Sequence, residues 1–137
     1  MAAIRSADTK PEIYIRKMLF ANGYRFRLHN KSVPGHPDIW LKKFNTAIFI
    51  HGCFWHRHRG CKYATTPATN SDFWDAKFRR NVERDQIVKN LLAERGIKCL
   101  IIWECSIKRM KKCKADELIY MDEIKSFMDS DLLFMEI

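Results

Sequence analysis

Hydrophobic positions near the start of the chain repeat with the period of a helix. Met18 and Leu19 lie three and four residues after Ile15, so the three side chains share one helix face. A Thr-Lys-Pro-Glu sequence precedes them, which is typical of a capping box with an early proline, and Gly23 follows as a stop. The pattern predicts a first helix over about residues 9–22.

Four later segments have the patterns of strands. Residues 24–29 alternate between apolar and polar side chains, and residues 38–41 begin an apolar stretch after a Pro-Gly-His-Pro turn. Residues 46–50 and 99–103 are almost continuously apolar over the length of a strand. Continuous apolar runs of this length are typical of strands that are buried on both faces.

Residues 73–95 and 115–128 have the spacing and length of helices. The longer helix ends before Gly96, and its inner face is expected to include Phe78, Val82, Leu91 and Leu92. The predicted order is helix, two or three strands, helix, strand, helix. A strand followed by a helical crossover and a further strand predicts an α/β fold with a mixed β-sheet flanked by helices, in a single domain over residues 1–137.

A loop of about residues 51–71 separates a buried strand from the long helix, and it is rich in metal-binding residue types. Cys53, His58 and Cys61 lie close together in this loop, and Cys105 follows the last predicted strand. Structural zinc takes four thiolate or imidazole ligands in a tetrahedron, so the spacing favours a zinc site that holds the loop in place. The alternative is that the loop cysteines are small core residues and His58 lies on the surface.

Several polar residues are candidates for phosphodiester chemistry. Asp38 opens a predicted strand, where a carboxylate can bind Mg²⁺; an aspartate after proline is also an ordinary turn residue. His56 and His51 are candidate general bases, and each can instead be an extra zinc ligand or a phosphate contact. Asn81 and Asp85 lie four residues apart on one helix face, which either points at the site or is a solvated, salt-bridged surface.

Two large aromatic residues, Phe54 and Trp55, stand between the proposed metal ligands, and Trp74 lies near the start of the long helix. Rings on a polar loop can stack on nucleic-acid bases or wedge between them. Packing of these rings against the loop is the alternative. The sequence leaves both interpretations open.

The charge of the chain narrows the class of partner. A formal net charge of +9 favours a polyanion, because basic residues that neutralise phosphates release counterions. No apolar run approaches the roughly 20 residues of a membrane span and no secretory signal opens the chain, so we expect a cytoplasmic protein. In a reducing compartment the five cysteines are expected to be ligands, reactive thiols or core residues rather than disulfides.

Six short motifs in the same order resemble the very-short-patch repair (Vsr) endonuclease family. They are Pro-Gly-His-Pro-Asp at 34–38, His-Gly-Cys-Phe-Trp-His at 51–56, Pro-Ala-Thr at 67–69, Phe-Trp at 73–74, Asn-Val-Glu-Arg-Asp at 81–85 and Trp-Glu-Cys at 103–105. The resemblance covers nearly the whole chain. It implies the restriction-endonuclease-like fold, a mixed β-sheet flanked by helices with a zinc-stapled loop.

The resemblance also implies roles for individual residues. Asp38 matches the Mg²⁺-binding aspartate, His56 the catalytic histidine and Glu12 a glutamate of the metal-water network, while His51 and Asp85 match supporting polar residues. A second Mg²⁺ ligand is implied to be the main-chain carbonyl of the residue aligned here, Ile50. The remaining implied sets are the structural zinc ligands Cys53, His58, Cys61 and Cys105, and the DNA-contacting residues Phe54, Trp55, Trp74 and Asn81.

By the same resemblance, we expect a Mg²⁺-dependent, zinc-containing enzyme that nicks one DNA strand on the 5′ side of the thymine in a T:G mismatch. Such mismatches arise when 5-methylcytosine deaminates. The expected setting is a monomer at the nucleoid, with functional links to a cytosine-5 DNA methyltransferase and mismatch-repair proteins. Met1 aligns inside the N-terminal arm of the family, which implies a shorter arm here. A relaxed nicking or restriction-type endonuclease and a non-catalytic zinc-containing DNA-binding module are the alternatives.

Overall fold

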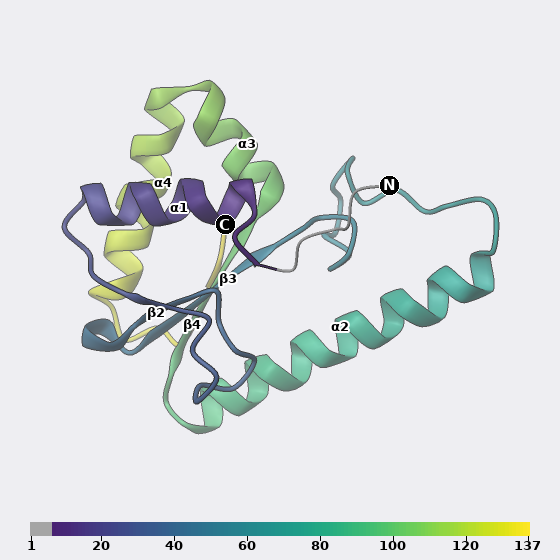
Figure 1. Ribbon diagram of the computed structural model, residues 1–137, viewed down its shortest axis with the longest axis horizontal. Coiled ribbons are helices and arrows are strands. Elements are labelled where there is room, and N and C mark those ends of the chain that lie inside the picture. Colours follow the sequence, from purple (N-terminus) through teal and green to yellow (C-terminus); the bar gives the residue numbers. More distant parts are fainter. Residues whose placement is uncertain (1–6) are drawn as a thin grey trace.

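The computed structural model describes residues 7–137, and these residues form a five-stranded sheet with helices packed on both faces (Figure 1). The shorter N-terminal arm expected from the resemblance falls largely on residues 1–6, outside the described residues. In chain order the elements are α1 (Lys10–Ala21), β1 (Arg27–Leu28), β2 (Ile39–Leu41), the 3-10 turn η1 (Lys42–Phe44), β3 (Thr46–His51), α2 (Ser71–Glu94), β4 (Lys98–Trp103), α3 (Glu104–Lys112), α4 (Lys114–Met128) and β5 (Phe134–Glu136).

The sheet is mixed, as the element order predicts. Its strands lie in the order β1-β2-β3-β4-β5, with antiparallel pairing from β1 to β3 and parallel pairing from β3 to β5. The parallel pair β3–β4 runs in register from Thr46 opposite Lys98 to His51 opposite Trp103. Because both strands end at the same edge, the residues that follow His51 and Trp103 emerge side by side.

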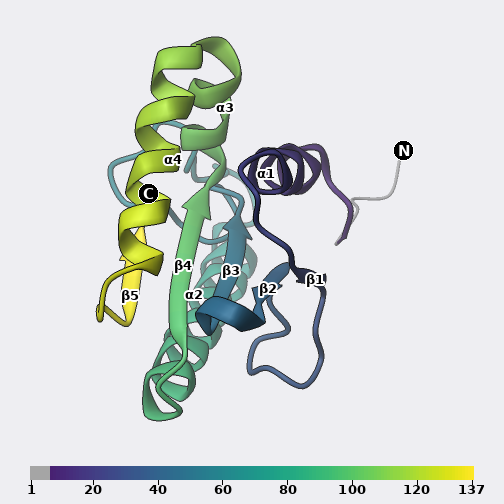
Figure 2. The same cartoon turned by 90° about the vertical axis from the view of Figure 1, so that its left-hand side faces the viewer.

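Two hydrophobic cores lie on opposite faces of the sheet. On one face, α1, α3 and α4 cover the sheet with fully buried residues such as Ile15, Ile107 and Ile124. On the other face, Leu92 from the C-terminal half of α2 packs with Phe49 and other sheet residues. Figure 2 shows the sheet between α1, α3 and α4 on one side and α2 on the other.

Three expectations about the elements were wrong in detail. Only Arg27 and Leu28 of the predicted strand 24–29 pair with β2. The sequence interpretation missed α3, whose few apolar residues lie in a strongly cationic segment, and β5, a three-residue strand that pairs with β4. Short elements of this kind depend on tertiary pairing more than on periodicity.

The inner face predicted for α2 is only partly correct. Phe78 and Leu92 are buried, whereas Val82 is 46% exposed and Leu91 is 39% exposed. Figure 1 shows the reason for Val82: the helix extends diagonally well past the sheet, so its N-terminal half has no sheet to cover. Within residues 7–137, no helix combines the length and the apolar character that a membrane crossing requires.

Candidate active site and metal cluster

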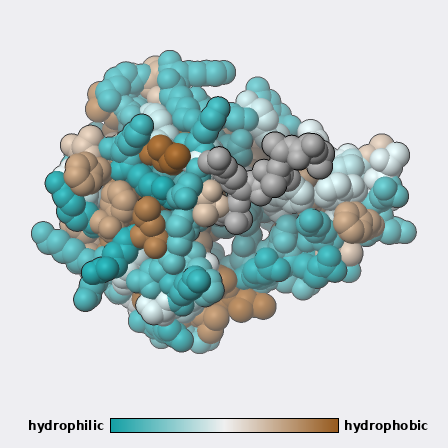
Figure 3. All heavy atoms as spheres, in the orientation of Figure 1, coloured by the Kyte–Doolittle hydropathy of each residue, from teal (hydrophilic) through white to brown (hydrophobic). Residues whose placement is uncertain are grey.

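A pocket of about 290 Å³ lies where the start of α1, the start of β2, the end of β3 and one face of α2 meet. Figure 3 shows a largely hydrophilic surface on this side, hollowed between the body of the molecule and the long helix. All the residues expected to carry or support catalysis or to bind Mg²⁺ line the pocket, together with Asn81, which was expected to contact DNA. The catalytic and Mg²⁺-binding set is Glu12, Asp38, Ile50, His51, His56 and Asp85.

Asp38 is held against the end of β3 by a main-chain hydrogen bond. The Ile50 amide donates to Asp38 Oδ2 at 2.7 Å. Burial raises the pKa of Asp38 to about 6, and the nearby Glu12 carboxylate adds to the rise, while the Ile50 amide opposes it. A partly desolvated carboxyl beside a second carboxyl favours either a proton or a bound cation.

Glu12 lines the pocket and also caps the start of α1. The Glu12 amide donates to Thr9 Oγ1, and Glu12 Oε2 accepts from the Asp8 amide at 2.7 Å. Arg16, one turn further along the helix, donates to the same oxygen at 3.2 Å. The Glu12 side chain is nevertheless buried, with the residue 4% exposed. Half of the predicted capping box is formed, because the return bond from Glu12 goes to the amide of Asp8 and not to that of the N-cap residue Thr9. A helix cap and a place at the site therefore coexist in one residue.

His29 is a site residue that the sequence interpretation missed. Its Nδ1 lies 3.9 Å from Asp38 Oδ1, and its Nε2 lies 3.8 Å from Glu12 Oε2. The same Nε2 is 3.2 Å from an Arg16 nitrogen. His29 has a left-handed φ of 48°, a conformation that is uncommon outside glycine. A signal was present: antiparallel pairing places the end of the first strand beside the start of the second, where Asp38 lies.

His56 and Asp85 form a hydrogen-bonded pair across the pocket. His56 Nδ1 lies 2.7 Å from Asp85 Oδ2, which fixes the ring and leaves Nε2 as the nitrogen for proton transfer. The His51 ring stacks on His56 with centroids 3.8 Å apart. Burial lowers the pKa of His51 to about 3, so this second ring is neutral. Ligand atoms of the three side chains lie within 4.8 Å of one another, close enough to hold an ion as well.

Asn81 connects the loop to α2. Its Nδ2 donates to the Trp55 carbonyl at 3.1 Å. Asn81 and Asp85 therefore do share a helix face that points at the pocket, as their four-residue spacing predicts. In the DNA-free protein, this amide positions the backbone of the loop beside the two histidines.

A second cluster joins the loop to the start of α3 and can hold a metal ion. The ligand atoms of Cys53, His58, Cys61 and Cys105 lie within 4.8 Å of one another. His58 Nδ1 is 3.6 Å from Cys53 Sγ and 3.4 Å from Cys105 Sγ. The parallel strands β3 and β4 explain the meeting, because Cys53 and Cys105 each follow a strand end by two residues. Burial raises the pKa of Cys53 to about 12, so a metal ion that bound there would have to displace a proton.

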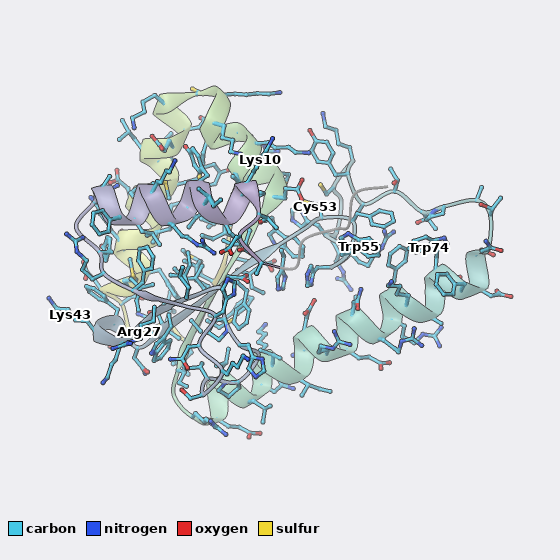
Figure 4. The ribbon with its side chains drawn as sticks, in the orientation of Figure 1. Lys10, Arg27, Lys43, Cys53, Trp55 and Trp74 are labelled. Carbon is cyan, nitrogen blue, oxygen red and sulfur yellow. The ribbon has the colours of Figure 1, made fainter. Side chains whose placement is uncertain are left out.

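The loop aromatics form a cluster with rings of α2. Phe54 makes edge-to-face contacts with Trp55, Trp74 and Phe78 at centroid distances of 5.0–5.8 Å. The Arg57 guanidinium lies 4.0 Å from the centre of the Phe78 ring. Figure 4 shows Trp55 and Trp74 close together between the loop and α2. Both tryptophans are only half-buried, so the cluster packs the loop and still presents ring surface to solvent.

Comparison with known proteins gives the family of the chain. The family model described as DNA mismatch endonuclease Vsr matches residues 1–62. A type II nicking enzyme of Neisseria meningitidis is 43% identical over 83% of this chain and 81% of its own length. A type II nicking enzyme of Xanthomonas oryzae is 39% identical over 84% of each chain. The DNA mismatch endonuclease Vsr of Escherichia coli is 39% identical over 86% of this chain and 75% of its own.

The three alignments cover 83–86% of this chain. A pocket with two carboxylates and an aspartate-bound histidine also suits hydrolysis of a phosphodiester. The chain belongs to the Vsr family of DNA mismatch endonucleases, and it is a DNA-nicking nuclease.

Proposed function

We propose that this protein is a Mg²⁺-dependent endonuclease that nicks DNA on the 5′ side of the thymine in a T:G mismatch left by deamination of 5-methylcytosine. One observation carries the proposal: the pocket that joins Asp38 and Glu12 to the His56–Asp85 pair. The mismatch preference draws on the aromatic cluster beside this pocket and on the E. coli relative named as a mismatch endonuclease.

Asp38 and the Ile50 carbonyl are the proposed Mg²⁺ ligands, with Glu12 acting through metal-bound water. In an antiparallel pair, the N–H and C=O of one residue face the same neighbouring strand, so the Ile50 carbonyl faces the side on which its amide meets Asp38. Carboxylate and carbonyl oxygens are the ligands that Mg²⁺ prefers. When bound, the ion would offset the negative charge that develops on the phosphate.

His56 is the proposed general base. Its Nδ1 is occupied by Asp85, so Nε2 is the nitrogen that takes a proton from the attacking water, and Asp85 stabilises the imidazolium that forms. The neutral His51 ring covers one face of His56 and restricts its rotation. His51 and Asp85 therefore act as supporting residues.

Replacement of His29 tests the proposed Mg²⁺ site. If His29 positions the two carboxylates for the metal, His29→Ala should raise the Mg²⁺ concentration for half-maximal nicking by about 10- to 100-fold, the range typical of residues that orient metal ligands. His29→Gln keeps hydrogen-bonding groups at the same place and should recover part of the loss. An unchanged Mg²⁺ titration for His29→Ala would remove His29 from the site.

Zn²⁺ is the proposed occupant of the Cys53, His58, Cys61 and Cys105 cluster. Three sulfurs and one imidazole suit a closed tetrahedral zinc site, which is structural rather than catalytic. The site would fix the loop that carries Phe54, Trp55 and His56.

The rings of Phe54, Trp55 and Trp74 are the proposed mismatch wedge, with Asn81 beside them. Opening a base stack costs a few kcal/mol and costs least where pairing is already poor. Each stack of a ring on a base returns about 1–3 kcal/mol, so the wedge favours a mismatched site over a paired one.

Removal of one ring should weaken this preference. In Trp55→Ala, the ratio of nicking rates on T:G and T:A duplexes should fall by about 5- to 150-fold, the equivalent of one stack of 1–3 kcal/mol. Phe20→Ala is the control, because Phe20 is an exposed ring on α1 outside the aromatic cluster. Equal ratios for wild type and Trp55→Ala would contradict the wedge.

A relaxed nicking endonuclease of the same fold is the second candidate, and the names of the Neisseria and Xanthomonas relatives favour it. The mismatch-specific and the relaxed enzyme are distinguished by incubating the protein with Mg²⁺ and T:G, T:A or C:G duplexes in a panel of flanking sequences. We expect nicks in T:G duplexes alone. Nicks in all three duplexes would support the relaxed enzyme, and binding without any cleavage would support a non-catalytic module.

The biological setting that we propose is a monomer acting on chromosomal DNA at the nucleoid. The mismatch that it would repair arises from 5-methylcytosine, so a cytosine-5 DNA methyltransferase and mismatch-repair proteins are the proposed functional partners. The net charge of +9 supports the DNA partner through counterion release.

A further inference from the structure

A second hollow lies beside the Cys/His cluster and is separate from the candidate active site. It has a volume of about 650 Å³, and none of its lining residues lines the catalytic pocket. Its walls come from loop residues 58–63, from α3, and from Tyr120 of α4 and the end of the chain. The only lining residues to which the sequence assigned a role are the proposed zinc ligands His58, Cys61 and Cys105.

The hollow is strongly cationic. Five basic side chains line it against two carboxylates, Glu123 and Glu136. The basic residues are Arg59, Lys62, Lys108, Arg109 and Lys112. Within residues 7–137, the ion pair of Lys108 with Glu104 at 3.5 Å is the only one that any of these five side chains makes. Most of the positive charge is therefore available to an anion from outside.

Two of the basic side chains lie over one tyrosine ring. Lys108 Nζ lies 3.9 Å and Lys62 Nζ 5.2 Å from the centre of the Tyr63 ring, which is 37% exposed. The next residue of α3, Arg109, donates to the Tyr120 hydroxyl at 3.5 Å. These contacts hold the positive groups around one concave surface, although each side chain is long and flexible.

A further hollow shares lining residues with both the cationic hollow and the catalytic pocket. This third hollow, of about 500 Å³, shares His51, His56 and Asp85 with the catalytic pocket, and it shares His58 and Arg59 with the cationic one. A small anion would occupy one hollow. A polymer with regularly spaced phosphates can occupy the reaction centre and reach α3.

We propose that the cationic hollow binds the sugar–phosphate backbone of the substrate DNA, at phosphates beyond the base step that is cut. The proposal rests on the DNA-nicking function of this chain and extends it to a second contact surface. The hollow contributes affinity and register without reading sequence, because phosphate contacts carry no base information.

The test measures the salt dependence of DNA binding. Asp38→Asn serves as the background in Mg²⁺ buffer, so that labelled T:G duplexes stay intact while fluorescence anisotropy is recorded. Lys108→Gln/Lys112→Gln neutralises two lysines one turn apart on α3. Lys42→Gln/Lys43→Gln is the matched control, since it removes two exposed lysines and Lys43 lies on the far side of the molecule from Cys53 and Trp55 (Figure 4).

The α3 pair should reduce the slope of log affinity against log salt by about 1 for each phosphate that the variant no longer neutralises. At physiological salt, this corresponds to binding that is about 5-fold weaker for one phosphate and 30-fold weaker for two. The weakening should appear on duplexes extended by about one helical turn (~10 bp) on each side, and it should shrink on a short duplex that ends near the mismatch. The control pair should keep the parent slope.

An unchanged slope for the α3 pair would overturn the proposal, and it is also the result expected if the hollow receives an acidic protein segment. Equal weakening by the two pairs would overturn it too, because it would reflect net charge alone. A wild-type protein that binds DNA with this salt dependence but never nicks would refute the proposed function and leave the hollow's role intact.

Discussion

Asp38→Asn should abolish nicking and, in the metal-free protein, raise stability. The nicking rate should fall by at least about 1,000-fold, because several kcal/mol of charge stabilisation depend on the Mg²⁺ that this carboxylate is proposed to bind. The variant keeps an oxygen that accepts from the Ile50 amide, so the fold should persist. Single-turnover nicking of a T:G duplex measures the loss.

The stability change follows from the direction of the pKa shift. The Asp38 pKa rises from 3.8 to about 6 on folding, so folding favours the protonated carboxyl. Metal-free wild type should therefore lose stability as pH rises from about 4 to 6, and it should not regain that stability at higher pH. At pH 7, Asp38→Asn should be more stable than wild type by roughly 1–3 kcal/mol. Thermal unfolding of both proteins at about pH 4 and at pH 7 measures this difference.

An exposed aspartate provides the control for both effects. Asp122 lies on the surface of α4, and Asp122→Asn should change neither nicking nor the unfolding free energy beyond about 0.5 kcal/mol. A stabilised but fully active Asp38→Asn would show that the carboxylate is strained by burial and has no part in catalysis. A variant that is inactive because it is unfolded would contradict the stability argument.

Loss of one Cys/His ligand should have the second large effect. Purified wild type should carry one equivalent of zinc, and Cys53→Ser should lose most of it. Structural zinc contributes about 10–16 kcal/mol to folding in small peptides, so the unfolding free energy should fall by several kcal/mol in this larger chain. Nicking should fall too, because His56 lies in the loop that the cluster holds. Metal analysis and thermal unfolding provide the two measurements.

Cys113→Ser is the matched control. Cys113 is exposed and lies outside the cluster, so its replacement should leave zinc content unchanged and stability within about 0.5 kcal/mol of wild type. A purified wild type without zinc would refute the metal assignment. Unchanged stability in Cys53→Ser would show instead that core packing alone holds the loop.

The cluster illustrates how much of a site local spacing can predict. Cys53, His58 and Cys61 are close in sequence, so their meeting could be anticipated from the loop alone. Cys105 is more than 40 residues away, and its place depends on the parallel register that ends β3 and β4 at one edge. Both strands were predicted from their apolar runs, so the sequence contained part of the information that places Cys105.

The sequence predicted neither the place of His29 at the site nor the cationic hollow. His29 reaches Asp38 because two short antiparallel strands meet at their ends, and a two-residue strand leaves a weak periodic signal. The hollow depends on α3, which was not predicted because lysines dominate its sequence. Phe54, Trp55 and Trp74 were recognised as a group, but their packing on Phe78 and Arg57 follows from where α2 projects.

The most direct test of the central claim maps the nick on one T:G duplex. Each strand is labelled separately, and the duplex is incubated with Mg²⁺ and either wild type or Asp38→Asn. We expect a single cut on the 5′ side of the mismatched thymine, in the thymine strand alone, made by wild type and absent with the variant. Cuts in the guanine strand, or the same cut made by Asp38→Asn, would contradict it.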